Sequence, residues 1–389
     1  MPINLYMSEI FSYFADKKIS NLKHTIMTSN SETANLCGLN RKDFQTTING
    51  KKTDLYILRN RKGYEVAISN YGGAICAIMV PDKDGNVANV VQGFDSIKSL
   101  METNEIYRST LIGRYGNRIC KGKFTLNGKE YQLALNDGPN HLHGGNKGYN
   151  MRVWDARQMG PRSLALNYTS PYGEEGFSGE VKLTVEFTFT DDNELVIEYL
   201  ATTNKKTIIC LTHHAFFSLA GIANPTPTIE DQICQINADF YLPIDNTSIP
   251  TGEILKVEGT PFDFRQPKAF GLEINADNEQ IKNGSGYDHN YVLNKKEEGE
   301  LSFAAKVVEP KSGRSLEVYT TEPGIQLYTA NFCNGAVGQH GATFPKRSAV
   351  CLECQHFPDS PNRPYFPSVI LRPTEQYKQK TIYKFGVEK

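Results

Sequence analysis

Residues 181–189, VKLTVEFTF, alternate apolar and polar side chains without a break. In an extended strand, successive side chains point to opposite faces, so this period of two buries one face and wets the other. The residues Asp191-Asp192-Asn193 then supply a turn, and residues 194–203 return with a similar pattern. The stretch therefore predicts a long antiparallel hairpin whose two strands share one buried face.

The same period recurs on both sides of this hairpin. Further strands are predicted at 54–58, 65–70, 74–80, 153–158, 163–168, 207–214, 301–308, 316–320, 325–330, 350–355 and 382–385. Turn dipeptides separate several of them, namely Asn127-Gly128, Asp84-Gly85, Lys62-Gly63 and Ser312-Gly313. Residues 96–102 form the best short helix candidate. Many strands are predicted, and helices do not alternate with them as in βαβ units. This pattern predicts an all-β fold, a large antiparallel β-sandwich with few short helices.

Composition narrows the functional classes. The chain has 389 residues and a net charge of −1, from 42 Lys and Arg against 43 Asp and Glu, which supplies no general field for binding nucleic acid. The longest apolar stretch, 74–80, is much shorter than a membrane span, so no membrane partner is expected. The 20 Phe and 20 Tyr suit sheets and sugar-binding clefts.

The domain organisation is predicted to be simple. We expect residues 1–40 to be a mobile N-terminal extension, with Met1 or Met27 as the start, and residues 41–389 to be a single domain. The apolar run 10–15 has no basic residues before it and no cleavage site close behind, so a secretory signal is not expected. Eight scattered cysteines indicate free thiols in a reducing compartment, which predicts a cytoplasmic protein. The Cys351-x-x-Cys354 pair lies in a predicted strand and is interpreted as two core thiols.

Polar, histidine-rich clusters recur at the predicted strand ends. They are GRYGNR (113–118), NDGPNHLHGG (136–145), LTHH (211–214), GYDHN (286–290) and LECQ (352–355). A zinc site is one alternative, since His141 and His143, or His213 and His214, are possible ligands. Neighbouring histidines on a strand face opposite ways, however, and no carboxylate stands at a recognised ligand spacing. We therefore expect no metal.

In this order the clusters resemble the aldose 1-epimerase (galactose mutarotase) family, from about residue 43 to residue 385. The matching pieces are GRYGNRI (113–119), NHLHGG (140–145), GYNMRVW (148–154), GEEGFSG (173–179), LTHHAFFSL (211–219), LPIDNTSIPTGEI (242–254), PFDF (261–264), GYDHNYVL (286–293), PGIQLYTAN (323–331), LECQHFPDSPN (352–362) and LRPTEQY (371–377). The resemblance implies the galactose mutarotase-like supersandwich, a large antiparallel β-sandwich with an open sugar cleft. It also implies an isomerase that interconverts the α- and β-anomers of free aldoses such as galactose and glucose.

Such a reaction needs one group to remove the C1 hydroxyl proton and another to protonate the ring oxygen, and it needs no cofactor. The resemblance implies Glu353 as the base and His214 as the acid. His213 replaces the family's usual Asn, which leaves open which imidazole faces the sugar. Strand alternation puts the two histidines on opposite faces, and the resemblance favours His214. As partners we expect only a small free aldose, with the protein a monomer or a weak dimer.

The resemblance also implies a set of substrate-binding residues, which are Asn117, Arg118, His143, Asp288 and Gln326. Two alternatives remain. A relative acting on a phosphorylated or unusual sugar would need extra cations, and the motifs supply only Arg114 and Arg118. A non-catalytic sugar-binding sandwich would not need an opposed acid and base. A glycosidase is not a third alternative: it would need two cleft carboxylates, for which Glu353 and Asp288 are conceivable, but the family resemblance outweighs it.

Overall fold

A computed structural model describes residues 35–388, and the expectations for residues 1–34 lie outside this range. Residues 35–40, which we assigned to the extension, include the buried side chains of Cys37 and Leu39. In the described part of the chain, strands dominate and only two α-helices occur, α2 (Ile97–Glu102) and α3 (Glu279–Gly284). No helix in that range is long and apolar enough to cross a membrane.

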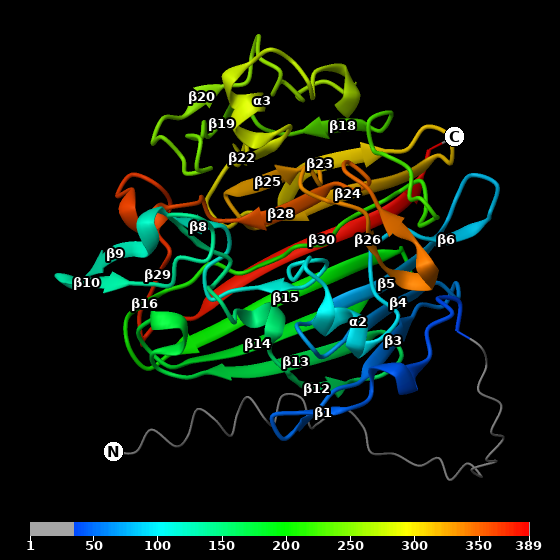
Figure 1. Cartoon of the computed structure of the whole chain (residues 1–389), viewed down its shortest axis with the longest axis horizontal. Helices are drawn as coiled ribbons and strands as arrows, with labels where there is room; N and C mark the ends of the chain where they lie inside the picture. Colours follow the sequence, from blue (N-terminus) through cyan, green and yellow to red (C-terminus); the bar gives the residue numbers. More distant parts are fainter. Residues whose placement is uncertain (1–34, 389) are drawn as a thin grey trace. The chain divides into compact units, whose positions relative to one another are not determined.

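Three sheets, all of antiparallel strand pairs, form the frame (Figure 1). The largest has nine strands in the order β12 (Asp155–Gln158), β13 (Ser163–Ser170), β14 (Val181–Phe189), β15 (Glu194–Thr203), β30 (Tyr377–Val387), β24 (Arg314–Thr320), β23 (Ser302–Val308), β18 (Ile233–Ile236) and β21 (Lys268–Ala269). The second has the order β20 (Leu255–Lys256), β19 (Phe240–Tyr241), β22 (Asp288–Val292), β25 (Gly324–Tyr328) and β28 (Cys351–Gln355). The third has the order β3 (Leu55–Arg59), β4 (Glu65–Ser69), β5 (Ala74–Pro81) and β6 (Val87–Asn89).

Short strand pairs complete the frame. They are β1 (Thr47–Ile48) with β2 (Lys51–Lys52), β7 (Leu111–Ile112) with β17 (Thr212–His213), β8 (Arg118–Ile119) with β11 (His141–Leu142), β9 (Lys123–Leu126) with β10 (Lys129–Gln132), β16 (Thr207–Ile208) with β29 (Ile370–Leu371), and β26 (Ala336–Val337) with β27 (Thr343–Phe344). The predicted turn between β9 and β10 has positive φ at both Asn127 and Gly128, as a type I′ turn requires.

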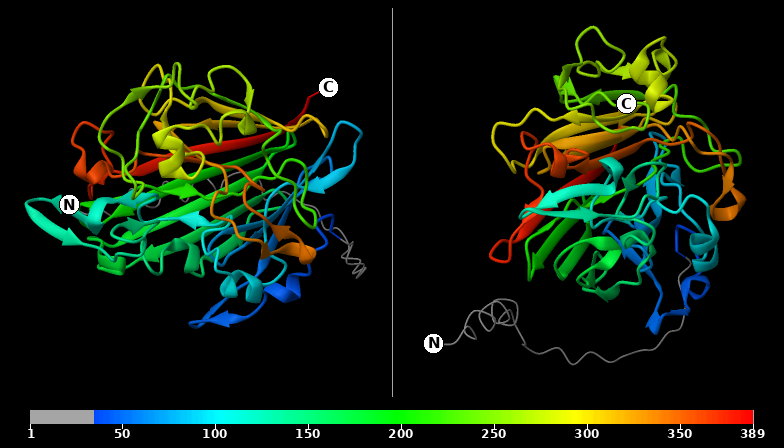
Figure 2. Two further views of the ribbon diagram at one scale, coloured as in Figure 1. Left: turned by 45° about the horizontal axis from the view of Figure 1, so that its top comes forward. Right: turned by 60° about the vertical axis from the view of Figure 1, so that its left-hand side comes forward.

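The alternation in β14 sets the core. Its odd-numbered residues are buried and its even-numbered residues are not, as the sequence predicts. Phe187 and its cross-strand partner Ile197 join one hydrophobic cluster with Val66 of the third sheet and Leu327 and Leu352 of the second. Figure 2 shows the long strands of the nine-stranded sheet running beside the other sheets. All three sheets therefore share one core, which confirms the predicted all-β sandwich.

Two predictions of local structure need correction. The strand expected at 207–214 is broken into β16 and β17, because its first part pairs with β29 and its second with β7. Helix α3 was not predicted, since six residues are too few to establish a helical period. It begins after Asn278, whose side chain accepts hydrogen bonds from the backbone N–H groups of Gln280 and Ile281.

Phe187→Ala is expected to lower the free energy of unfolding by about 3–5 kcal/mol, because it empties a fully buried site in the shared core. Lys182→Ala, on the exposed face of the same strand, should change it by no more than about 0.5 kcal/mol. Urea unfolding followed by circular dichroism measures both. Equal effects of the two substitutions would contradict the assignment of the two faces.

Candidate active site

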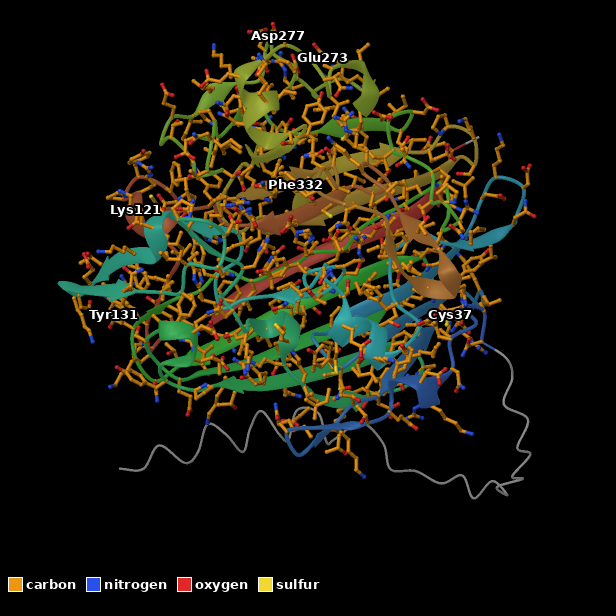
Figure 3. The ribbon with its side chains drawn as sticks, in the orientation of Figure 1. Cys37, Lys121, Tyr131, Glu273, Asp277 and Phe332 are labelled. Carbon is orange, nitrogen blue, oxygen red and sulfur yellow. The ribbon has the colours of Figure 1, made fainter. Side chains whose placement is uncertain are left out.

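A cleft of about 630 Å³ opens beside the second sheet. Asp288 of β22, Tyr328 of β25 and Glu353 of β28 face it, and the loops around residues 104–108, 136–143 and 246–248 form its other walls. Phe332, labelled in Figure 3, lies at its exposed side with its ring stacked on Tyr328. The polar clusters at 113–118, 136–145, 211–214, 286–290 and 352–355 each contribute a residue to this cleft or to its immediate support.

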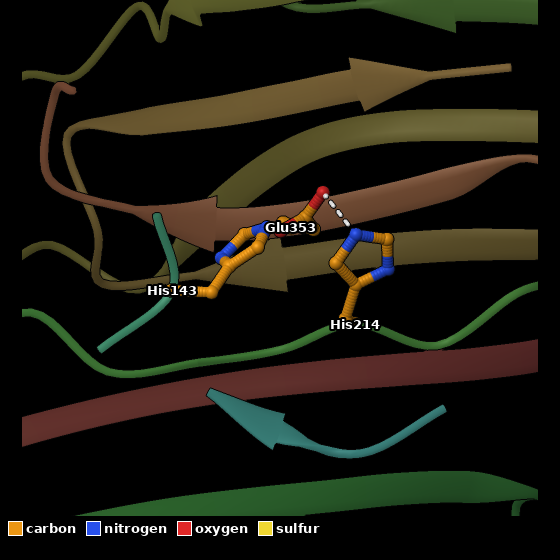
Figure 4. A group of neighbouring side chains, drawn as sticks. All are labelled: His143, His214 and Glu353. Carbon is orange, nitrogen blue, oxygen red and sulfur yellow. Dashed lines mark ion pairs between the residues drawn. The ribbon is translucent and has the colours of Figure 1, made fainter. Parts of the chain in front are cut away.

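Glu353 and His214 meet inside the cleft (Figure 4). Leu352 and Cys354 pack into the core, so strand alternation turns Glu353 to the opposite side. His214 follows β17 and is held by backbone hydrogen bonds with Thr110 and Ser109. Its Nε2 lies 3.5 Å from Oε1 of Glu353, and the two side chains are only 7% and 2% exposed. A carboxyl group and an imidazole therefore face each other in a nearly dry space.

A stack of rings fixes the plane of His214. The imidazole lies parallel to Phe216, with centroids 4.9 Å apart, and the guanidinium of Arg108 lies 4.6 Å from the centroid of the same phenyl ring. Arg108 is itself anchored by Gln92 and Glu105. The stack lets His214 move little, and the nearby Arg108 charge disfavours its protonated form.

His213 faces away from the cleft. Its Nε2 donates to the carbonyl oxygen of Gly73 at 3.1 Å, and its ring contacts Phe187 edge-on in the core. Of the two adjacent histidines, the structure thus places only His214 beside Glu353.

Burial changes the protonation of the pair. It lowers the pKa of His214 to about 3, with smaller contributions from His213 and Arg108. It also raises the pKa of Glu353 well above its usual value, with a further increase from Asp288. Both shifts disfavour charge, so they favour the form in which the pair holds one proton on the carboxyl group and both groups are neutral.

His143 is oriented by the backbone. The N–H of Asn117 donates to Nδ1 of His143 at 3.1 Å, which leaves the ring proton on Nε2. His143, His214 and Glu353 have ligand-type atoms within 4.8 Å of one another. A metal bound through Nε2 of His143 would need the opposite tautomer and would put two N–H groups face to face. The donor set therefore fits a hydroxylic ligand better than a metal.

Arg118 and Asp288 both line the cleft. Nε of Arg118 donates to Asp137 at 2.7 Å, and its remaining guanidinium N–H groups can donate to a ligand. Burial raises the pKa of Asp288, while Arg118 opposes this shift. Gln326 pairs in register with Glu353 and donates to Asp288 at 2.7 Å, but it does not line the cleft. Among the predicted site residues, Gln326 alone is not part of the cleft lining, although its side chain lies on the same face of the sheet as Glu353.

Several cleft residues were missed by the sequence analysis. Tyr107 packs against His143 with centroids 4.7 Å apart, and Arg108, Tyr328 and Phe332 also line the cleft. Tyr107, Arg108 and Phe332 lie in loops and form no motif, whereas Tyr328 lies in the matched piece PGIQLYTAN (323–331) but was not assigned to the site. Arg114, which was counted as a nearby cation, is buried away from the cleft and donates to Ser170 and to the carbonyl of Gly179.

Comparison with known proteins agrees with this geometry. The family model described as aldose 1-epimerase matches residues 54–384. The chain is 44% identical over 323 residues to the galactose mutarotase of Bos taurus, covering 83% of this chain and 91% of that protein. It is 34% identical over 341 residues to the aldose 1-epimerase of Escherichia coli (strain K12), covering 87% and 97%.

Solved structures show the same fold. A GalM/aldose epimerase homologue from C. elegans superimposes with a TM-score of 0.79 at 29% identity, over 87% of this chain and all of that one. A galactose 1-epimerase from Lactobacillus acidophilus gives a TM-score of 0.77 at 28% identity, over 88% and 97%.

The ring nitrogens of His143 provide a test of the site. We expect ¹⁵N NMR of imidazoles to show the Nε2–H tautomer for His143 and a neutral ring at pH 6, because burial lowers its pKa well below 6.5. His141 is the internal control, since its Nδ1 faces the carbonyl of Ala134 at 2.9 Å and must carry the proton. An Nδ1–H tautomer for His143 would contradict the assigned donor role.

Proposed function

The chain belongs to the aldose 1-epimerase family, and on that premise we propose that it interconverts the α- and β-anomers of a free aldohexose such as galactose or glucose. The observation that carries this proposal is the 3.5 Å approach of Nε2 of His214 to Oε1 of Glu353 inside the cleft. A mutarotase needs such an opposed acid and base, whereas simple sugar binding does not.

The proposed reaction moves two protons and breaks one C–O bond. The Glu353 carboxylate removes the proton from the C1 hydroxyl while His214 gives a proton to the ring oxygen. The ring opens to the aldehyde, the C1–C2 bond rotates, and the hydroxyl on C5 attacks the other face as the two groups exchange roles. The pair is regenerated, so no cofactor is consumed.

The single proton of the pair suits this cycle. The pKa shifts favour the proton on Glu353, and its transfer to Nε2 of His214 creates the ionised base and the charged acid together. Oε2 of Glu353 and Nδ1 of His214 have no hydrogen-bond partner among the described residues. Oε2 is therefore free to accept the C1 hydroxyl proton.

The remaining cleft residues are proposed to bind the sugar. Nε2–H of His143 donates to an oxygen near C1, Asp288 accepts from a hydroxyl, and Asn117 and Arg118 donate to hydroxyl oxygens. Gln326 is proposed to act through Asp288, whose carboxylate it holds.

Charge in the cleft favours a neutral sugar over a phosphorylated one. The cations that line it are Arg108 and Arg118, and each is already paired with a carboxylate, Glu105 at 3.3 Å and Asp137 at 2.7 Å. A phosphate would have to displace these partners. Burial also raises the pKa of both Asp288 and Glu353, which disfavours the ionised carboxylate that a glycosidase needs beside its acid.

We further propose that the protein works in the cytoplasm as a monomer or weak dimer. All eight cysteines are free thiols, and seven of them are buried, which suits a reducing compartment.

The proposed activity is tested by optical rotation. Fresh α-D-galactose and α-D-glucose should reach their equilibrium rotation faster with the protein than in buffer alone. Rates equal to buffer for both sugars would overturn the proposal.

Substitutions test the two roles. Glu353→Gln and His214→Asn should each lower kcat by about 10²–10⁴, because neither group can replace the other in proton transfer. The double variant should be little slower than either single variant, since the pair acts as a unit. The matched control is His213→Asn, which should retain most activity if its hydrogen bond to Gly73 is structural. An inactive His213→Asn beside an active His214→Asn would reverse the assignment.

The pH profile of kcat/KM should be bell-shaped and broad. At low pH both groups hold a proton and no base remains, and at high pH both have lost it and no acid remains. Burial lowers the pKa of His214 to about 3 and raises that of Glu353, so the one-proton state should span more than the roughly two pH units that separate the unperturbed groups. Initial rates of mutarotation across pH measure this, and a plateau narrower than about two units would contradict it.

A further inference from the structure

A second, larger cavity of about 1160 Å³ shares no lining residue with the catalytic cleft. Its floor is the polar face of β14, β15 and β30, with Glu186, Glu198 and Lys380 side by side in register. Its walls are the segments 292–299, 321–323 and 365–368. We call this cavity the sheet groove. It occupies the face that the alternation in β14 leaves outside the core.

The sheet groove deepens at a gap beside β30. Strand β24 pairs with β30 only as far as Thr320 opposite Thr381, so residues 377–380 extend past the end of its ladder. Glu322 and His356 line the cavity beside this end of the ladder, with Oε2 of Glu322 2.6 Å from Nδ1 of His356. Glu322 is 2% exposed. Nδ1 of His356 is thus committed to Glu322, and Nε2 is its remaining polar atom.

Neither catalysis nor the core explains this pair. Burial lowers the pKa of His356, but the Glu322 carboxylate raises it overall, so the pair favours its charged form. Desolvating two charges is costly and contributes little net stability compared with apolar packing. A buried pair at the bottom of an open cavity is a fixed polar anchor for a ligand.

The charges of the sheet groove nearly cancel. Four lysines and five glutamates line it. They partly neutralise each other, as Lys380 does with Glu198 at 3.3 Å, while Nζ of Lys295 is held by Ser302 and two backbone carbonyls. Alternating donors and acceptors without a net field suit hydroxyl groups better than an ion.

An aromatic platform stands at the rim. Tyr365 is 62% exposed, yet its hydroxyl donates to the carbonyl of Gly252 at 2.8 Å and its ring meets Phe366 edge-on at 5.0 Å. The ring is therefore exposed and already ordered, so stacking of a ligand on it costs little side-chain entropy of Tyr365.

We propose that the sheet groove is a second binding site for a neutral oligosaccharide, with Tyr365 as stacking platform and the Glu322–His356 pair as hydroxyl partner. Its volume exceeds the roughly 300–1,000 Å³ of ordinary small-molecule sites, which favours a chain of several sugar units over one. The site would hold the enzyme near a source of free sugar without occupying the catalytic cleft.

The test uses methyl β-cellotrioside and methyl α-maltotrioside, whose blocked anomeric carbons cannot mutarotate. Isothermal titration calorimetry is run on the full chain with excess galactose present to fill the catalytic cleft. Saturable binding of either glycoside supports the proposal. Binding of neither up to about 10 mM overturns it.

Two variants locate the binding. Tyr365→Ala should weaken glycoside binding about five- to tenfold, as the loss of one stacking contact predicts, and leave galactose mutarotation unchanged. The matched control is Tyr172→Ala, which removes a tyrosine of similar exposure, 59%, that lines neither cavity. Equal binding by both variants would overturn the placement in the sheet groove. Because the readout is binding outside the cleft, its failure is distinguishable from a failure of the proposed mutarotase activity.

Discussion

The opposite orientation of neighbouring side chains in a strand is the constraint on which the catalytic cleft depends. In β28 it buries Leu352 and Cys354 in the shared core, and the same geometry turns Glu353 into the cleft. The core therefore anchors the carboxyl group that we propose as the base, since Glu353 cannot turn away without withdrawing its neighbours from the core. Register with β25 then places Gln326 beside it and links it to Asp288.

Burial of Glu353 and His214 in this part of the fold changes which of their protonation states is favoured. An ionised carboxylate without a charged partner is costly to bury, and the pair avoids that cost by keeping one proton and remaining neutral. The stack of His214 on Phe216, with Arg108 beyond, holds the imidazole in place while disfavouring its charge. In the proposed mechanism the proton moves when a substrate supplies new hydrogen bonds, as expected of a preorganised site.

The sequence predicted those features that depend on local pattern. The hairpin of β14 and β15 follows from alternation alone, and strand alternation separates His213 from His214. The sequence did not predict contacts between segments that are far apart in the chain. The segment 207–214 pairs with two different strands, and Arg114 lies buried among loop carbonyls although its motif borders the cleft. Tyr107 and Phe332 reach the cleft from loops, where no period exists to reveal which way a side chain points.

The same alternation that builds the cleft also leaves the nine-stranded sheet with a polar outer face. An exposed sheet face normally needs only charged side chains for solubility, and Glu198 paired with Lys380 meets that need. The buried Glu322–His356 pair and the ordered ring of Tyr365 go beyond it, because a charged pair gains little from burial and an exposed ring gains little from being fixed. These features lie around one cavity and are not required for stability, so they support the proposed second binding site on the outer face of the nine-stranded sheet.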